Sequence, residues 1–165
     1  MSSESDLEQV IAQERALVFK QFDENVAFAI GARIRDAANA AGQGIAIEVR
    51  LWDRPLFYGA TAGSSASNKH WIERKAYTVR MLMKSTYRVV LERGDKPRVF
   101  EENWGLDPRD YAIAGGGFPI TLAGIGVVGA VIVSGVPERD DHGYVVAAIC
   151  SVLGLDPAEY MLPAL

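Results

Sequence analysis

A glycine-rich, uncharged segment from 112 to 137 constrains the fold of this chain more than any other feature. Its 26 positions carry no charge, a length that could span a bilayer as a helix. Seven glycines and Pro119 would break such a helix. Phe118–Leu122 and Gly126–Ser134 instead have the composition of two apolar strands joined by a turn, and no polybasic flank indicates a membrane anchor. We therefore expect paired strands here and no membrane partner.

Regular patterns on either side of this segment predict the remaining elements. Apolar residues at helical spacing, with capping residues before them and glycine after them, predict helices, whereas apolar runs bounded by turn residues predict strands. The length fits one domain over residues 1–165. The expected elements are an N-terminal helix at about 5–20, a helix between Asp23 and Gly42, a hairpin over 44–58, a helix capped by Asn68 and continuing to about Ser85, and a last helix over 144–153.

The composition argues against several classes of function. A formal net charge of −4 and a pI near 5.2 argue against a dedicated nucleic-acid partner. The one cysteine, Cys150, permits no disulfide framework, and its apolar neighbours favour a small buried hydrophobe over a nucleophile. The acidic first 25 residues form no secretory signal. We therefore expect a cytoplasmic protein.

The sequence from Gly124 to Gly129 matches the dinucleotide-binding pattern G-x-G-x-x-G. That pattern binds a pyrophosphate only where a helix begins inside it, because the free backbone N–H groups at the helix start hold the phosphates. Here the β-branched run Val131–Val133 follows, which predicts a strand. We therefore interpret these glycines as strand residues.

Two histidines, His70 and His142, lie at the predicted starts of the third and last helices. The helix dipole there favours a neutral imidazole that can accept a proton or bind iron, although Asp140 and Asp141 oppose this effect at His142. The alternative is that both are solvated helix-end residues. Neither belongs to a metal-binding motif, and no nucleophile elbow or P-loop is present in the sequence. We therefore assign no metal ligand and no catalytic residue.

Basic side chains accompany both histidines. Arg74 and Lys75 lie one turn into the third helix, and Arg139 lies near the start of the last one. Together they would hold a carboxylate or a phosphate, with arginine as a planar fork and lysine as a point charge. The alternative is a set of exposed helix charges. Trp71 and Trp104 would line a pocket or pack in a core.

Three motifs resemble the GlcG/HbpS-like family, also called the haem-degrading domain family. They are Gly115–Ile120, the glycine-rich strand Gly126–Gly135, and Asp141-His142 at the start of the last helix. The segment Asn68–Lys75 is further similar to an uncharacterised branch with the pattern N-x-x-W-x-x-R-K. The resemblance covers about 24–153.

This resemblance implies a fold and a set of partners. The fold is α+β, with an antiparallel sheet of about five strands flanked by helices on both faces, in a profilin-like three-layer arrangement. Members usually assemble into higher oligomers, so the expected partners are other copies of this chain and a small molecule. The family name implies haem as a cofactor, while the segment Glu48–Arg54 departs from the pattern of other members.

Three hypotheses for function follow. The leading one is an oligomeric protein that binds a small, anionic ligand between the third and last helices. The second is haem binding or degradation, with His70 or His142 on the iron. The third is a non-enzymatic assembly or adaptor protein, suggested by the apolar last helix. The candidate ligand-binding residues are Asn68, His70, Trp71, Arg74, Lys75, Asp141 and His142.

Overall fold

The computed structural model describes residues 3–164, and most of its helices and strands are those that the sequence predicts. In chain order the elements are α1 (Ser3–Ala16), β1 (Val18–Phe19), α2 (Glu24–Ala40), β2 (Ala46–Leu51), β3 (Pro55–Ala60), α3 (Ala66–Leu82), α4 (Thr86–Arg93), the 3-10 helices η1 (Glu102–Trp104) and η2 (Pro108–Asp110), β4 (Gly117–Leu122), β5 (Gly126–Ser134), α5 (Glu138–Leu153) and α6 (Pro157–Tyr160).

The strands form one sheet in the order β1-β4-β5-β2-β3. The β2–β3, β2–β5 and β4–β5 pairs are antiparallel, and β1 runs parallel to β4. The sheet is therefore mixed, and the prediction of an antiparallel sheet is wrong at this edge. The predicted count of five strands and the two glycine-rich strands are confirmed.

The parallel edge arises because the first helix ends earlier than predicted. It ends at Ala16 rather than near residue 20, and the chain continues as the short strand β1. Leu17 and Phe19 are fully or almost fully buried whereas Lys20 is exposed. This two-residue alternation is the spacing of a strand, and burial against β4 stabilises it in place of another helical turn.

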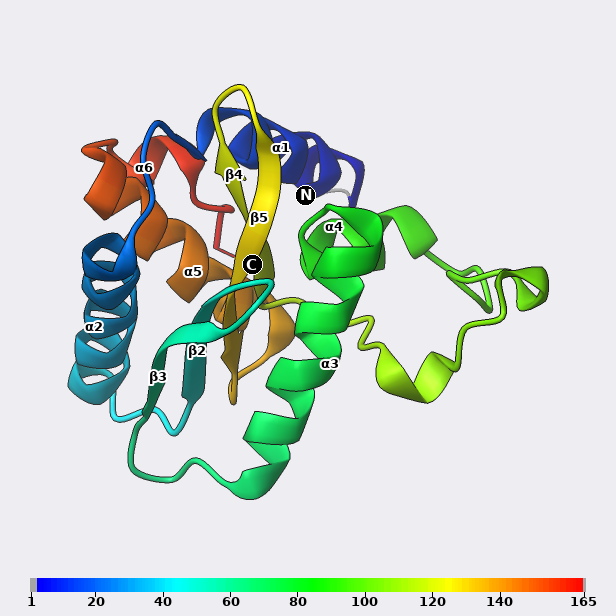
Figure 1. The fold of residues 1–165 in the computed structure, drawn as a ribbon, viewed down its shortest axis with the longest axis horizontal. Coiled ribbons are helices and arrows are strands. Elements are labelled where there is room, and N and C mark those ends of the chain that lie inside the picture. The colour runs from blue at the N-terminus through cyan, green and yellow to red at the C-terminus, as the bar shows by residue number, and fades with distance from the viewer. Residues whose placement is uncertain (1–2, 165) are drawn as a thin grey trace.

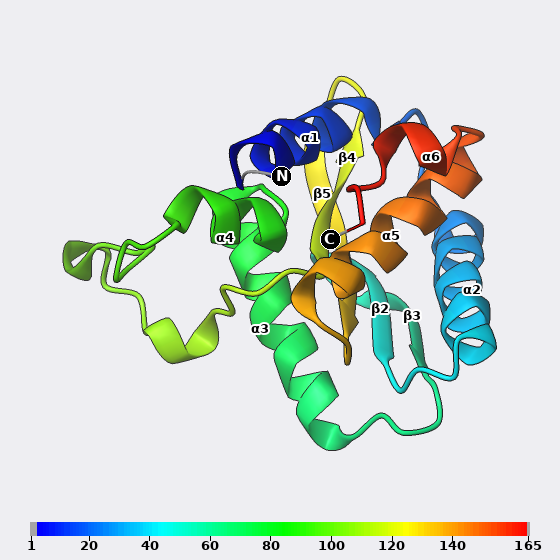
Figure 2. The same ribbon diagram turned by 180° about the vertical axis from the view of Figure 1, so that it is seen from behind.

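Helices cover both faces of the sheet, which gives three layers (Figures 1 and 2). The strands alternate accordingly: Val131 and Val133 of β5 lie in the core with α2 and α5, while Ala130 and Ile132 lie in the core with α3. The last helix finds its cover inside the chain, against α2, α6 and the sheet. Its apolar surface, which suggested an assembly role, is thus occupied by the subunit itself.

Capping chemistry sets the ends of α2 as predicted. The Val26 N–H donates to Asp23 Oδ1 at 2.9 Å, so Asp23 is the N-cap. At the other end Gly42 adopts φ +65°, the left-handed conformation expected just past a helix end. The predicted hairpin over 44–58 is confirmed as β2 and β3.

The third helix differs from the prediction at both ends. Its N-cap is Ser65, and Asn68 is the third helical residue, whose Oδ1 accepts from the Ser65 N–H at 2.8 Å. Met83 adopts φ +54° and ends the helix, after which Ser85 caps the separate helix α4 by accepting from the Arg88 N–H. The prediction of one helix continuing to about Ser85 is therefore wrong at its end, because Ser85 provides the start signal of a second helix.

The glycine-rich segment contains neither a phosphate-binding loop nor a membrane span. No helix starts inside the G-x-G-x-x-G match: Gly126 and Gly129 lie in β5, as interpreted from the sequence, whereas Gly124 lies in the turn between β4 and β5. Within residues 3–164 no helix is both long enough and apolar enough to cross a membrane. Residues 94–111 project from the body beside α3 and α4, with positive φ at Gly94 and Gly105 (Figure 1).

We predict that Gly129→Ala destabilises the fold by about 2 kcal/mol or more, a size expected when a core must shift. A Cβ at Gly129 would lie 2.0 Å from the Arg50 carbonyl oxygen of the neighbouring strand, so β5 and β2 would have to separate. Chemical denaturation measures the change. The control is Gly143→Ala in α5, where a Cβ meets only the flexible end of Met161 at 3.2 Å and helix propensity favours alanine. Equal stability of the two variants would contradict this packing argument.

Candidate functional site

A buried ion pair joins α3 to α5 where β5 ends. Lys75 Nζ lies 2.8 Å from Asp141 Oδ2 and donates to the Val133 carbonyl oxygen at 2.9 Å. The second carboxylate oxygen of Asp141 accepts from the Val136 N–H at 3.1 Å. Lys75 is 2% exposed and Asp141 is 3% exposed. Two residues that the sequence places 66 positions apart therefore form one charged contact.

Glycine provides the space for this pair. Gly116 adopts φ +119°, and a Cβ there would lie 2.4 Å from the Val133 carbonyl oxygen and 2.8 Å from Lys75 Nζ. A side chain at position 116 would therefore collide with both atoms of the hydrogen bond between Lys75 Nζ and the Val133 carbonyl oxygen. The glycine run before β4, which appeared in the sequence as a strand feature, thus also lets the backbone pass against the ion pair.

Burial acts on both ionisable groups of the pair. It lowers the pKa of Lys75 and raises the pKa of Asp141, because each charged form loses its hydration, while the attraction between the two charges opposes both shifts. Each group therefore depends on the other to remain charged. Removing either partner would leave a buried charge without compensation.

An open cleft of about 420 Å³ lies over the ion pair, between α3 and the start of α5. Four of the residues proposed from the sequence line it, namely Asn68, Trp71, Lys75 and Asp141. The remaining lining residues are small, polar or acidic: Ser67, Ala114, Ser134, Gly135, Val136 and Glu138.

Three of the lining side chains carry N–H donors for which the described residues 3–164 supply no acceptor. Lys75 has three N–H bonds, and the structure pairs two of them. The side-chain N–H groups of Asn68 and the indole N–H of Trp71 have no hydrogen-bond acceptor among residues 3–164. The Glu138 carboxylate, in contrast, accepts from the Gly115 N–H at 3.1 Å. The cleft therefore offers donors to an acceptor-bearing ligand.

Two arginines proposed for the site are engaged elsewhere. Arg74 donates to the carbonyl oxygens of Arg109 and Tyr111, at 2.8 Å each, and its guanidinium lies 4.7 Å from the Trp71 ring centroid. It therefore anchors the projecting segment and supports Trp71 from behind. Arg139 pairs with Asp6 of α1, so the expectation that it joins Arg74 and Lys75 around one anion is wrong.

The two histidines do not come together in one site. His70 is exposed on α3 and does not line the cleft. His142 is 1% exposed and faces α1, because it follows Asp141 by about 100° around the helix. The proposal that both imidazoles share the cleft with Lys75 is therefore wrong in its geometry.

The surroundings of His142 fix its tautomer. Gln13 Nε2 donates to the Tyr160 carbonyl oxygen at 2.8 Å, which turns Gln13 Oε1 toward His142 Nε2 at 2.7 Å. The imidazole is therefore protonated on Nε2, and among residues 3–164 its buried Nδ1 has no partner. Burial, with a smaller contribution from the nearby Arg139 charge, lowers the pKa of His142 to about 3.

Sequence reasoning missed a buried acid on the sheet face under α3. Glu48 is 2% exposed and lies 3.2 Å from Arg50 and 3.7 Å from Lys69. The signal was present, because β2 alternates and Glu48 is in phase with the buried Ala46. Cys150, by contrast, is buried as predicted, and burial raises the pKa of its thiol to about 11.

The side chains that bind metals do not form a cluster in the part of the chain that the structure describes. No group of three or more His, Cys, Asp and Glu side chains lies close enough to hold an ion there. A haem iron would need an accessible imidazole nitrogen. His142 has one ring nitrogen bonded to Gln13 and the other enclosed, with its ring centroid 5.2 Å from that of Tyr87 and 5.9 Å from that of Phe118. Neither nitrogen can reach a haem iron as an axial ligand, so the residues around His142 do not fit a haem bound through this side chain.

Comparison with known proteins identifies the class to which this fold belongs. The model of the family described as haem degrading protein HbpS-like matches residues 22–150. A UPF0303 protein of Brucella anthropi is 53% identical over 162 residues, covering 98% of this chain and 96% of the relative. The chain therefore belongs to the HbpS-like family, as the motifs at 68–75, 115–135 and 141–142 predicted.

Solved structures show the same fold. The crystal structure of Ybr137w protein matches with a TM-score of 0.81 and 26% identity, covering 91% of this chain and 89% of that one. The crystal structure of a PduOC:Heme complex matches with a TM-score of 0.67 and 13% identity, covering 79% and 94% of the two chains.

We predict strong coupling between Lys75 and Asp141 in a double-mutant cycle. Lys75→Met or Asp141→Asn alone should cost about 3–5 kcal/mol of unfolding free energy, because each leaves a buried charge unpaired. The double variant should lose clearly less than the sum. The exposed pair Arg54–Glu24, 2.8 Å apart, is the control, with a coupling below about 1 kcal/mol. Additive losses at Lys75 and Asp141 would show that the pair does not act as a unit.

We also predict a pH dependence that His142 causes. Its pKa is about 3 in the folded protein, against an ordinary histidine value of 6.5 in the unfolded chain, so the unfolded chain binds more protons between these limits. The stability that this difference contributes is complete above about pH 6.5 and is lost as the pH falls toward 3, by at most about 1.4 kcal/mol per pH unit.

The measurement is the unfolding free energy between pH 7.5 and 5, conditions chosen to span about one to two units around the ordinary histidine pKa. His142→Gln, which keeps a donor toward Gln13, should flatten the curve relative to the unsubstituted protein. His70→Gln, at an exposed site, should leave it unchanged. If His70→Gln flattens the pH dependence and His142→Gln does not, His142 is not its cause.

Proposed function

We propose that this protein binds a small molecule that carries a carboxylate or carbonyl oxygen, in the cleft between α3 and α5. The observation that carries the proposal is the set of free donors in that cleft: the third Lys75 N–H, the Asn68 amide and the Trp71 indole N–H. Donors that converge in one concave site define an acceptor-bearing ligand. The flat Trp71 ring, held from behind by Arg74, offers an apolar surface for the rest of the ligand.

The charge of the cleft limits the ligand further. Lys75 is balanced by Asp141, and Glu138 adds a negative charge at the rim. With Arg74 and Arg139 engaged elsewhere, the cleft lacks the positive charge that a multiply charged phosphate would require. A ligand with a single carboxylate or carbonyl group therefore fits better than a polyanion.

Two conservative variants test this proposal. Asn68→Asp keeps the oxygen that accepts from the Ser65 N–H but replaces the amide donors with a negative charge that repels a carboxylate, and Trp71→Phe keeps a ring but removes the indole N–H. Each should weaken binding about tenfold, as expected for a lost hydrogen bond to a charged group. Thermal shift and calorimetric titration with small monocarboxylates, from acetate to benzoate, measure the effect.

The control is Trp104→Phe, which makes the same change at an exposed indole on the projecting segment, away from the cleft. It should bind the monocarboxylates as the unsubstituted protein does. Affinities that remain equal across Asn68→Asp, Trp71→Phe and Trp104→Phe would overturn the proposal.

Haem is the second candidate, because the family model carries the description haem degrading protein and one structural neighbour is described as a heme complex. In this chain the two nitrogens of His142 are occupied or enclosed, which argues against that residue as an axial ligand. Haemin therefore belongs in the same titrations. A Soret band that His142→Gln or His70→Gln abolishes would favour haem over the proposed oxygen-bearing ligand.

A further inference from the structure

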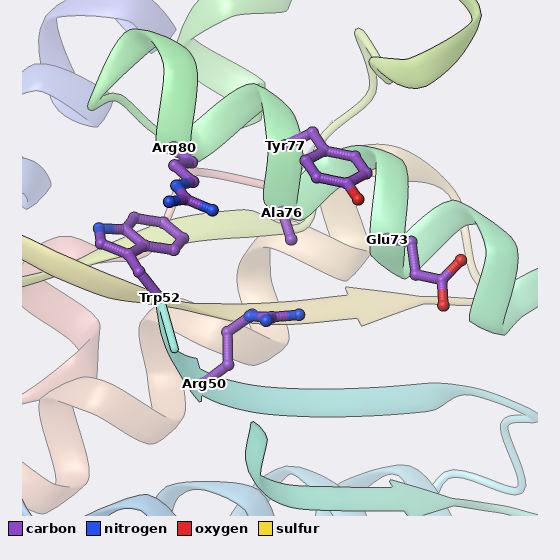
Figure 3. A pocket seen from close by; sticks show the side chains of 6 residues that line it. All are labelled: Arg50, Trp52, Glu73, Ala76, Tyr77 and Arg80. Atoms are coloured by element: carbon purple, nitrogen blue, oxygen red, sulfur yellow. The ribbon is translucent and has the colours of Figure 1, made fainter. Parts of the chain in front are cut away.

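Another hollow, drawn in Figure 3, is lined by residues of α3 other than those that line the cleft, on the opposite flank of the helix. It encloses about 190 Å³ between α3 and β2. The buried residues Ile72 and Val79 separate the two sides of the helix, so the two hollows share no lining residue. The lining residues of this groove, which we call the arginine groove, are Arg50, Trp52, Glu73, Ala76, Tyr77 and Arg80.

Arg50 is held in place on the floor of the arginine groove. Its Nη1 donates to Glu48 at 3.2 Å and its Nε donates to the Leu51 carbonyl oxygen at 3.3 Å. The side chain is only 25% exposed. Among residues 3–164 its Nη2 has no hydrogen-bond acceptor. Arg50 therefore offers donors in a fixed orientation, and a ligand that binds there loses little side-chain entropy.

Arg80 forms the opposite wall and is free to bind an anion. Its guanidinium carbon lies 6.0 Å from the centre of the Trp52 ring. The Trp52 indole N–H points to the Val127 carbonyl oxygen at 3.4 Å, which orients the ring. Within the described chain, 3–164, Arg80 has no hydrogen bond and no ion pair. Figure 3 shows Arg50 and Arg80 extending from β2 and α3 toward the same gap, with Trp52 beside Arg80.

The charges around the arginine groove leave one positive charge unbalanced. Two acids lie near the groove, and Lys69 forms an ion pair with each: its Nζ is 2.8 Å from Glu73 and 3.7 Å from Glu48. Glu48 also contacts Arg50. Neither acid contacts Arg80 within 4.0 Å in the described residues. The basic residues here are Arg50, Lys69 and Arg80, against the acidic residues Glu48 and Glu73.

From this geometry we propose that the arginine groove is a second binding site, for an anionic group attached to a flat ring. A carboxylate or a phosphate is the head group that two guanidinium forks recognise. Trp52 and the half-exposed Tyr77 provide ring faces against which the flat part of the ligand packs. The volume admits only a head group and part of a ring. This site is separate from the cleft and does not depend on the function proposed above.

Phenyl phosphate and benzoate are the probes, because they present the two head groups on the same ring. Arg80→Gln removes one fork and, within the described chain, no hydrogen bond or ion pair; it loses only the exposed contact with the Trp52 ring and should fold normally. It should weaken binding of the preferred probe at least tenfold in calorimetric titration. Arg50→Lys, which keeps a positive charge beside Glu48, should weaken it severalfold through loss of the planar fork. Tighter binding of phenyl phosphate or of benzoate identifies the head group.

The matched control is Arg33→Gln, which removes the same charge from an exposed position on α2, the helix on the other side of the sheet. It should bind both probes as the unsubstituted protein does. Equal affinities in Arg80→Gln and Arg33→Gln overturn the proposal, as does a lack of saturable binding to the unsubstituted protein at millimolar concentrations. Loss of binding of the preferred probe in Asn68→Asp and Trp71→Phe but not in Arg80→Gln also overturns it, because that probe would then occupy the cleft.

Discussion

The contact between Lys75 and Asp141 is the interaction on which the rest of the molecule depends. It crosses from a helix on one face of the sheet to a helix on the other, past the end of β5, and it is almost entirely excluded from water. A buried pair of this kind contributes less net stability than its short distance suggests, because both charges have lost their hydration. Its effect is on arrangement: it joins α3 to α5 at this point, and both residues line the cleft.

The position of α3 in turn creates two different environments. On the flank toward α5, the basic groups are balanced or engaged with backbone carbonyls, and the free donors are one Lys75 N–H, the Asn68 amide and the Trp71 indole. On the flank toward β2, Arg80 remains without a counter-charge and Trp52 provides an aromatic face. One helix thus separates a cleft without an unbalanced positive charge from a positively charged groove. The difference arises because the two acids on the β2 flank, Glu48 and Glu73, contact Lys69 and not Arg80, whereas on the α5 flank Asp141 contacts Lys75.

Sequence patterns predicted those elements that local interactions specify. Asp23 and Gly42 bound α2 because a cap and a left-handed glycine act within a few residues of themselves. The paired glycine-rich strands were predictable for the same reason. The prediction failed at β1, where burial against a distant strand ended a helical pattern, and at His142, whose direction depends on α1. The candidate site was partly predictable: the spacing placed Asn68, Trp71 and Lys75 on one side of α3, but it gave no means of seeing that Arg74 binds Arg109 and Tyr111.

The sequence by itself determined the four longest helices, the hairpin, the glycine-rich strand pair and membership of the HbpS-like family, because periodicity, caps and motifs are properties of neighbouring residues. Only the tertiary structure decided which charges are free. Four basic residues look alike in the sequence but differ in the structure. Lys75 is buried with a carboxylate and Arg74 binds carbonyl oxygens. Arg139 pairs with Asp6, whereas Arg80 has no acidic partner within the described chain. The physical reason is that a charge takes its role from its partner and its exposure to water, and both are set by segments far away along the chain.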